Sequence, residues 1–166
     1  MKYRIEEITA RTRIGKVLDV GCNDGQLAQC IYEKGEREVF GIDIDGGKVA
    51  QSVASFPNVS FLQANAESIP FPDDYFDTVV VAELLEHLGK NQGKVLSEIQ
   101  RVSKGHMVWS LPVGDYWLGE ATHQWVLNGT AISHHTQEGI DDCVKTPLYK
   151  HIIVLEWIRK RWLTDK

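Results

Sequence analysis

Short apolar segments alternate with longer amphipathic segments over the first two thirds of the chain, and this alternation strongly limits the possible folds. Parallel β-strands need crossover connections, usually helices, so the pattern predicts an α/β fold with a mostly parallel sheet that is covered on both faces. We predict strands at residues 16–20, 39–44, 59–63, 76–81 and 106–111, and helices at residues 26–34, 48–56, 83–88 and 94–102.

The alternation ends near Pro112, which cannot donate a hydrogen bond to a continuing sheet. Beyond it, Asn128-Gly129 lies between β-prone residues. Both residues tolerate the positive φ angles of a type I′ turn, so we predict a hairpin over residues 125–132.

Thr146 followed by Pro147 is typical of the start of a helix. This pair predicts a helix that finishes near Trp162, and a strand through residues 152–154 is the alternative. No internal repeat or linker divides the chain. We therefore expect a single domain over residues 1–166, with an irregular C-terminal third that contains a hairpin and a helix.

Composition narrows the functional classes. The chain has 166 residues, of which 43% are hydrophobic and 25% charged, and this fits one domain with a sizeable core. Its 18 Lys and Arg residues against 23 Asp and Glu residues give a formal charge of -5. A negative chain is poorly suited to neutralise phosphates, so we do not expect a nucleic-acid partner.

Cys22, Cys30 and Cys143 are widely spaced and form no CxxC pair, which argues against a disulfide framework and a thiolate metal site. No apolar run is typical of a signal peptide or a membrane span. We therefore expect a cytoplasmic protein with no metal ion and no membrane partner. Three histidines lack the carboxylate or cysteine pattern of a metal site: His123, His134 and His135.

A tight turn follows the first predicted strand, at Gly21-Cys22-Asn23-Asp24-Gly25. Backbone N–H groups and the positive end of the next helix point to the ligand crevice of an open α/β sheet. Gly21 lets a ligand approach the backbone, Gly25 allows close packing of the helix, and Asn23 tolerates a left-handed conformation.

This turn is a poor match to a dinucleotide fingerprint, which needs glycines at positions 21, 23 and 26, because only Gly21 is present. Asp24 would also place a carboxylate where a pyrophosphate lies, and like charges repel each other there. The Asp24 carboxylate would instead attract a ligand with a cationic group. S-adenosylmethionine, which carries an ammonium and a sulfonium, is such a ligand.

Four motifs in order resemble those of the class I, Rossmann-like S-adenosylmethionine-dependent methyltransferases, particularly the group called methyltransferase type 11. The resemblance extends from about residue 16 to residue 112 and implies a three-layer Rossmann-like sandwich. Asn23 stands where the family usually has the middle glycine of its first motif. The four matching segments are residues 19–25, 41–45, 63–77 and 81–88.

The resemblance also implies roles for single residues in binding the donor. Asp19 orients the turn, and Gly21, Cys22, Asn23 and Gly25 contact the methionine moiety. Asp43, followed by Ile44, accepts hydrogen bonds from the ribose hydroxyls. Asn65 and Ala66, in the same stretch as Glu67, contact the adenine, while Ala82 lies beside the methionine end. Ordinary helix capping is the alternative for Asn65 and Glu67.

Glu83 and His87 are four residues apart and would share one face of the predicted helix over residues 83–88. A modest ion pair is the ordinary outcome of this spacing. His87 is also a candidate proton acceptor, because its unperturbed pKa lies near neutrality. We take both as candidate catalytic residues.

The resemblance implies an enzyme that transfers a methyl group from S-adenosylmethionine by direct displacement, and we expect a small-molecule acceptor. Orientation alone can lower such a barrier by about 7 to 11 kcal/mol, so no general base or metal is required. One alternative is a catalytically weak module that binds S-adenosylmethionine or S-adenosylhomocysteine and acts with a partner. NAD-linked oxidoreduction is the last alternative.

Overall fold

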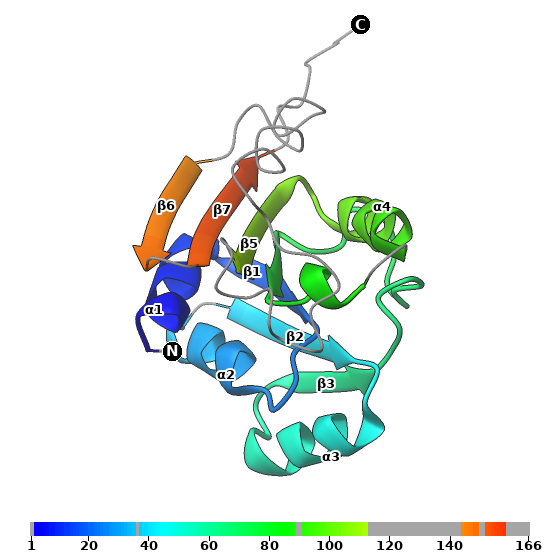
Figure 1. The fold of residues 1–166 in the computed structure, drawn as a ribbon. Helices are drawn as coiled ribbons and strands as arrows, with labels where there is room; N and C mark the ends of the chain where they lie inside the picture. Colours follow the sequence, from blue (N-terminus) through cyan, green and yellow to red (C-terminus); the bar gives the residue numbers. More distant parts are fainter. Residues whose placement is uncertain (1, 36, 89–90, 113–143, 150–151, 159–166) are drawn as a thin grey trace, which may run out of the picture.

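The computed structural model describes residues 2–35, 37–88, 91–112, 144–149 and 152–158 (Figure 1). Its helices are α1 (Lys2–Arg11), α2 (Gln26–Glu33), α3 (Gly46–Ser55) and α4 (Gln92–Val102), together with the 3-10 turn η1 (Leu85–His87). Its strands are β1 (Gly15–Val20), β2 (Arg37–Asp43), β3 (Ser60–Gln63), β4 (Thr78–Ala82), β5 (His106–Pro112), β6 (Val144–Tyr149) and β7 (Ile152–Ile158).

The strands form one seven-stranded sheet in the order β3-β2-β1-β4-β5-β7-β6. The first five run parallel, whereas β7 pairs antiparallel with both β5 and β6. The order changes direction between β1 and β4, which is the switch point where open α/β sheets bind ligands beyond the carboxyl ends of their strands. The predicted α/β fold with a mostly parallel sheet is confirmed.

Successive side chains of a β-strand point to opposite faces of the sheet, so the buried residues of one strand belong to two separate clusters. Leu18 and Val79 pack in one cluster with residues of α4. Their neighbours Val17 and Val80 belong to a second cluster, together with Ile31 of α2 and Ile8 of α1. Helices therefore cover both faces of the sheet, which gives the three layers seen in Figure 1.

The predicted helix over residues 83–88 is wrong. Glu83 has a φ of +51°, which no α-helix accepts, and only a 3-10 turn follows it. The backbone N–H of Glu83 donates to the carbonyl of Ser110 on β5 (3.0 Å), so this residue is still held by the sheet. The other predicted elements of the first two thirds are present, with ends that differ by a few residues.

The predicted helix from Thr146 to Trp162 is also wrong in the described residues, where the chain forms β6 and β7. The alternative, a strand through residues 152–154, is confirmed. The full length of β7 pairs with β5, from His106 opposite Ile158 to Pro112 opposite Ile152. This long-range pairing outweighs the local helix signal. The predicted hairpin over residues 125–132 lies outside the described residues.

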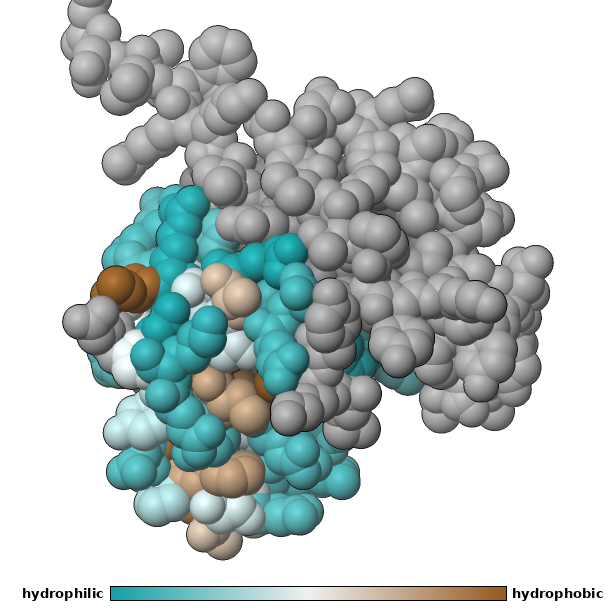
Figure 2. Space-filling view, turned by 90° about the vertical axis from the view of Figure 1, so that its left-hand side faces the viewer, coloured by the Kyte–Doolittle hydropathy of each residue, from teal (hydrophilic) through white to brown (hydrophobic). Residues whose placement is uncertain are grey.

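Figure 2 shows that one described face of the molecule is mainly hydrophilic, with small apolar areas between the polar ones. The exposed large apolar residues are separate positions such as Ile14, Val53 and Leu62. Exposed apolar residues of this kind are ordinary on protein surfaces. Among the described helices, none has the length and apolar character needed to cross a bilayer.

Candidate functional site

The turn after β1 is fixed by hydrogen bonds to β2. The N–H groups of Gly21 and Cys22 donate to the carbonyl of Ile42, at 2.8 Å and 2.9 Å. Positive φ angles at Gly21 (+77°), Asn23 (+48°) and Gly25 (+78°) turn the chain from β1 into α2. These angles suit glycine and asparagine, so the left-handed conformation expected of Asn23 is present.

Close packing surrounds Gly25, as the sequence predicts. A Cβ atom there would lie 2.7 Å from Cζ of Phe61 and 2.9 Å from Oγ of Ser52. The Ser52 hydroxyl also donates to the carbonyl of Asn23, at 3.1 Å. Helix α3 and strand β3 thus press directly against the turn, and no side chain fits at position 25.

Asp43, at the end of β2, joins this turn to the next loop. Its Oδ2 accepts from the N–H of Asn23 and its Oδ1 accepts from the N–H of Asp45, both at 2.9 Å. Each carboxylate oxygen has two lone pairs, so the group can still accept hydrogen bonds from a ligand. The next residue, Ile44, is 68% exposed.

The segment after β3 lies beside Asp43, because the N–H of Ala64 donates to the carbonyl of Asp43 (2.9 Å). Oδ1 of Asn65 accepts from the N–H of Glu67 (2.9 Å), so Asn65 closes a turn; the alternative of helix capping is wrong, because no helix begins at residues 64–67. The Glu67 carboxylate accepts from Asn91 Nδ2 at 2.7 Å. We call residues 21–25, 43–45 and 64–67 the loop cluster.

A second group of polar side chains lies at the ends of β1 and β4, and we call Arg4, Asp19, Glu83 and Glu86 the acid cluster. Asp19 and Glu86 are each 1% exposed. Glu83 accepts a hydrogen bond from the Ser110 hydroxyl (2.8 Å), and its other oxygen lies 3.6 Å from Nη1 of Arg4. Oδ2 of Asp19, both carboxylate oxygens of Glu86 and Nε of Arg4 are buried without a hydrogen-bond partner.

Burial perturbs the titration of these acids. It raises the pKa of Asp19 to about 7; the negative charge of Asp43 adds to this rise and Arg4 opposes it. Burial likewise raises the pKa of Glu86 to about 7, with Glu83 adding to the rise and Arg4 opposing it. Near neutral pH these two carboxyl groups are therefore only partly ionised, and a nearby cation would favour their ionised forms.

The buried position of Cys22 in the turn disfavours its thiolate form. Burial and the nearby carboxylates of Asp19 and Asp43 raise the pKa of the Cys22 thiol well above its ordinary value. A thiol in such surroundings stays protonated and unreactive.

The structure brings the predicted donor-binding residues to one edge of the sheet, since they follow or end β1, β2, β3 and β4. The predicted helical pair of Glu83 and His87 is wrong, because Glu83 lies outside any helix and contacts Ser110 and Arg4. Nε2 of His87 instead lies 4.0 Å from Oε1 of Glu86. The hydrogen bonds that hold the turn come from Ile42 and Asp43, so the role of Asp19 in orienting it stays a prediction.

Sequence reasoning missed Arg4, Ser110 and the buried state of Glu86. No local signal indicates that α1 and β5 contribute side chains next to Glu83, since these contacts depend on the sheet order. Within the described residues, no three His, Cys, Asp or Glu side chains are grouped to hold a metal ion. The three histidines considered as ligands, His123, His134 and His135, lie outside that part of the chain.

Comparisons with known proteins agree with this arrangement. A family model described as "Methyltransferase domain" matches residues 18–108. A probable S-adenosylmethionine-dependent methyltransferase of Mycobacterium tuberculosis is 32% identical over 103 residues, covering 60% of this chain and 36% of the relative. The ubiquinone/menaquinone biosynthesis C-methyltransferase UbiE of Shewanella sp. is 34% identical over 111 residues, covering 62% of this chain and 43% of the relative.

The aligned region thus spans about a third to two fifths of the length of these relatives. Among solved structures, the methyltransferase domain of bacterial CtHen1-CN shares the fold, with a TM-score of 0.77 at 14% identity, covering 95% of this chain and 98% of that domain. The family model spans more than half of the chain, from within β1 through α4, and this part carries the loop cluster and all members of the acid cluster except Arg4. The chain therefore belongs to the class I S-adenosylmethionine-dependent methyltransferases, in the methyltransferase type 11 family.

Proposed function

We propose that this protein binds S-adenosylmethionine at the carboxyl edge of the sheet and transfers its methyl group to a small-molecule acceptor. The acid cluster is the observation that carries the proposal. Three carboxyl groups face one arginine there, and the Asp19 and Glu86 side chains are buried with unpartnered oxygens. Such a site favours a cation and opposes a pyrophosphate, so it fits a sulfonium nucleoside better than a dinucleotide.

The loop cluster fits the nucleoside part of the same ligand. The Asp43 carboxylate has lone pairs left for two ribose hydroxyls, and Ile44 offers an exposed apolar side chain next to it. The Asn65 amide and the backbone at Ala66 would hold the adenine. Gly21, Cys22, Asn23 and Gly25 would lie along the methionine moiety, with Ala82 and the acid cluster on the other side.

The sulfonium, when bound, supplies an electrophilic methyl carbon. The chain then has to orient the acceptor in line with that carbon and exclude water, which requires no covalent step on the protein. His87 is the better candidate to take a proton from the acceptor, because its ring is 38% exposed and lies near Glu86. Glu83 is bound to Ser110 and Arg4, so we assign it to binding and charge balance.

A small acceptor is also supported by the name of one relative, a C-methyltransferase of ubiquinone/menaquinone biosynthesis. This relative's name does not identify the acceptor of the present chain. Candidate acceptors therefore need to include phenols, amines and quinone precursors, with a lysine-containing peptide as a protein-like comparison.

Isothermal titration with S-adenosylmethionine, S-adenosylhomocysteine and NADH tests the donor site. We expect both sulfur nucleosides to bind and NADH to bind at least tenfold more weakly, that is by about 1.4 kcal/mol. Equal or tighter binding of NADH would reject the proposal. Consumption of the methyl donor over the acceptor panel then tests the reaction, and binding without transfer to any acceptor would favour the non-catalytic module.

A further inference from the structure

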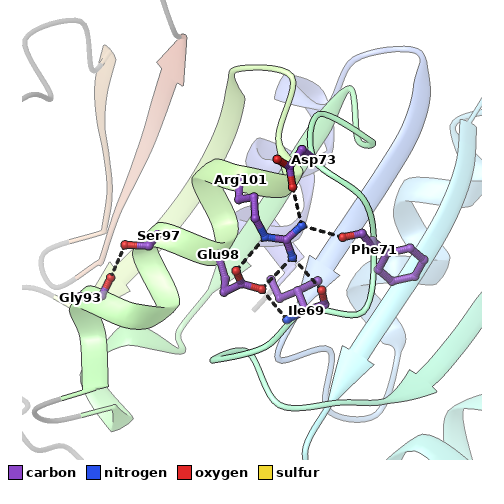
Figure 3. A network of polar contacts seen from close by, with 7 residues as sticks. All are labelled: Ile69, Phe71, Asp73, Gly93, Ser97, Glu98 and Arg101. Carbon is purple, nitrogen blue, oxygen red and sulfur yellow. Dashed lines mark hydrogen bonds and ion pairs between the residues drawn. The ribbon is translucent and has the colours of Figure 1, made fainter.

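Arg101, near the end of α4, binds the chain segment between β3 and β4 with its whole guanidinium group (Figure 3). Nε and Nη2 donate to the two carboxylate oxygens of Glu98, each at 2.7 Å. Nη1 donates to the carbonyl of Phe71 (2.8 Å) and to Oδ1 of Asp73 (2.9 Å), while Nη2 also donates to the carbonyl of Ile69 (2.8 Å). All five N–H donors of the side chain are therefore used.

Glu98 also binds the segment between β3 and β4, through the backbone of Ile69. Its Oε2 accepts from the N–H of Ile69 at 2.8 Å, so both backbone polar groups of Ile69 are held by side chains of α4. The N–H of Asp74 donates to the backbone carbonyl of Arg101 (2.8 Å). Closer to the start of α4, Asn91 donates to Glu67. Contacts along α4 thus bind the segment from residue 67 to residue 74.

This connection, residues 64–77, contains no helix or strand in the structure. A segment of such length has many conformations unless side chains fix it. Apolar packing fixes part of it, because the ring of Phe71 contacts Phe40, Tyr75 and Phe76 at centroid distances of 5.4, 5.5 and 4.9 Å. The backbone on either side of Phe71 is fixed by Arg101 and Glu98.

We propose that Arg101 is a positioning residue for the donor: it holds residues 69–74 directly, and thereby keeps the attached residues 64–67 in the conformation that binds the adenine, without touching the ligand itself. This inference rests on the proposed function, because residues 64–67 are the segment assigned there to the adenine. A donor site that is correctly formed in only a fraction of molecules binds its ligand more weakly by that fraction. Loss of Arg101 is therefore expected to lower donor affinity.

A purely structural role for Arg101 predicts a different result, and Arg37 is a matched control. Arg37 also bridges backbone segments, donating to the carbonyls of Thr12 and Gly35, both at 2.7 Å, and to the Thr12 hydroxyl at 3.1 Å. It lies at the start of β2, at the opposite end of the sheet from the loop cluster. Loss of Arg37 is expected to lower stability without disturbing the donor site.

The experiment compares Arg101→Gln and Arg37→Gln with the wild type by thermal unfolding and by titration with S-adenosylhomocysteine. Both variants are expected to melt at lower temperature. Arg101→Gln is expected to bind S-adenosylhomocysteine about tenfold more weakly, which corresponds to a correctly formed loop in about a tenth of the molecules. The affinity of Arg37→Gln is expected to stay within about twofold of that of the wild type. Hydrogen exchange without ligand is expected to be faster at residues 64–74 in Arg101→Gln only.

Wild-type affinity in Arg101→Gln, or equal losses in both variants, would overturn the inference while leaving the proposed function intact. Failure of the wild type to bind S-adenosylhomocysteine would reject the proposed function and the inference with it. Should Arg101→Gln not fold, Glu98→Gln is the second variant, because it weakens the same contacts to Ile69 and Arg101 and keeps the side-chain size. It is expected to bind a few times more weakly, and unchanged affinity would again overturn the inference.

Discussion

The loop cluster and the acid cluster lie at the same edge of the sheet, yet they differ in how their polar groups are satisfied. In the loop cluster, Asp43 and Asn65 accept hydrogen bonds from backbone N–H groups. In the acid cluster, Asp19 and Glu86 are buried with unpartnered carboxylate oxygens, and Arg4 is the cation that opposes their charge. The polar groups of the first region are hydrogen-bonded to the backbone, whereas the second region holds buried carboxylate oxygens that accept no hydrogen bond within the described residues.

The two clusters would contribute differently to the proposed ligand site. The hydrogen-bonded turns of the loop cluster are fixed by the fold, which would lower the ordering cost of binding a ligand there. The acid cluster lowers stability, because burying carboxyl groups without hydrogen-bond partners is costly, and the proposed cationic ligand would offset this cost. We therefore expect variants in the loop cluster to reduce stability or affinity, and variants in the acid cluster to change the dependence on pH.

Substitution of Gly25 has the largest expected effect on stability, because it breaks the packing on which the loop cluster depends. Gly25→Ala places a Cβ atom 2.7 Å from Phe61 at a φ of +78°, which we expect to cost about 3 kcal/mol of unfolding free energy. Gly35→Ala is the control, since Gly35 has a φ of +76° but open space around it. It is expected to cost about 1 kcal/mol. Equal losses in urea unfolding would contradict the packing argument.

Substitution of Asp43 tests the binding role of the loop cluster. Asp43→Ala leaves the Asn23 N–H and the ribose hydroxyls without their acceptor, so we expect S-adenosylhomocysteine to bind more weakly by about 1 to 3 kcal/mol. Asp45→Ala is the comparison, because Asp45 caps α3 through Gly47 and Lys48. Its loss is expected to reduce stability by about 1 kcal/mol with little change in affinity. A comparable loss of affinity in both variants, measured by titration calorimetry, would reject the assignment of Asp43.

Substitution of Asp19 tests the acid cluster through pH. The native pKa of about 7 lies above the ordinary value of 3.8, so the native state holds this proton more tightly than the unfolded state does. Stability is therefore lost as pH rises from about 4 through 7, by on the order of 2 kcal/mol between pH 5 and pH 8. Asp19→Asn removes this term, so its stability relative to wild type should increase from pH 5 to pH 8. Parallel pH profiles in chemical denaturation would show that Asp19 is already ionised in the native state.

Substitution of Lys94, in the first turn of α4, has the smallest expected effect, because this side chain contacts the loop cluster through Glu67 alone among the described contacts. Its Nζ lies 3.5 Å from the Glu67 carboxylate, and its side chain is 64% exposed. Exposed pairs of this kind contribute little, so Lys94→Ala is expected to change stability by less than about 0.5 kcal/mol and affinity by less than about twofold. A larger loss of affinity would extend the positioning role of α4 from Arg101 to its first turn.

Much of the fold could be predicted from the sequence because its signals are local. The alternation of apolar and amphipathic segments places β1 to β5 and the helices between them within a few residues. Gly21, Asn23 and Gly25 indicate a turn of positive φ angles without any tertiary information. The spacing of Glu98 and Arg101, three residues apart on one helix, was a local signal of a side-chain pair that could have been used.

The remaining features depend on partners far away in the chain. The predicted helices over residues 83–88 and from Thr146 to near Trp162 do not form in the described residues, because Glu83 is held by Ser110 and β7 pairs along β5. The same sheet order brings Asp19 and Glu86 within electrostatic reach of Arg4 and buries their two carboxyl groups. The sequence by itself determined the alternation of elements and the shape of the turn after β1, since neighbouring residues decide both. Only the tertiary structure decided which charged side chains are buried and which loop is bound to α4, because burial and long-range hydrogen bonds exist only once the sheet has formed.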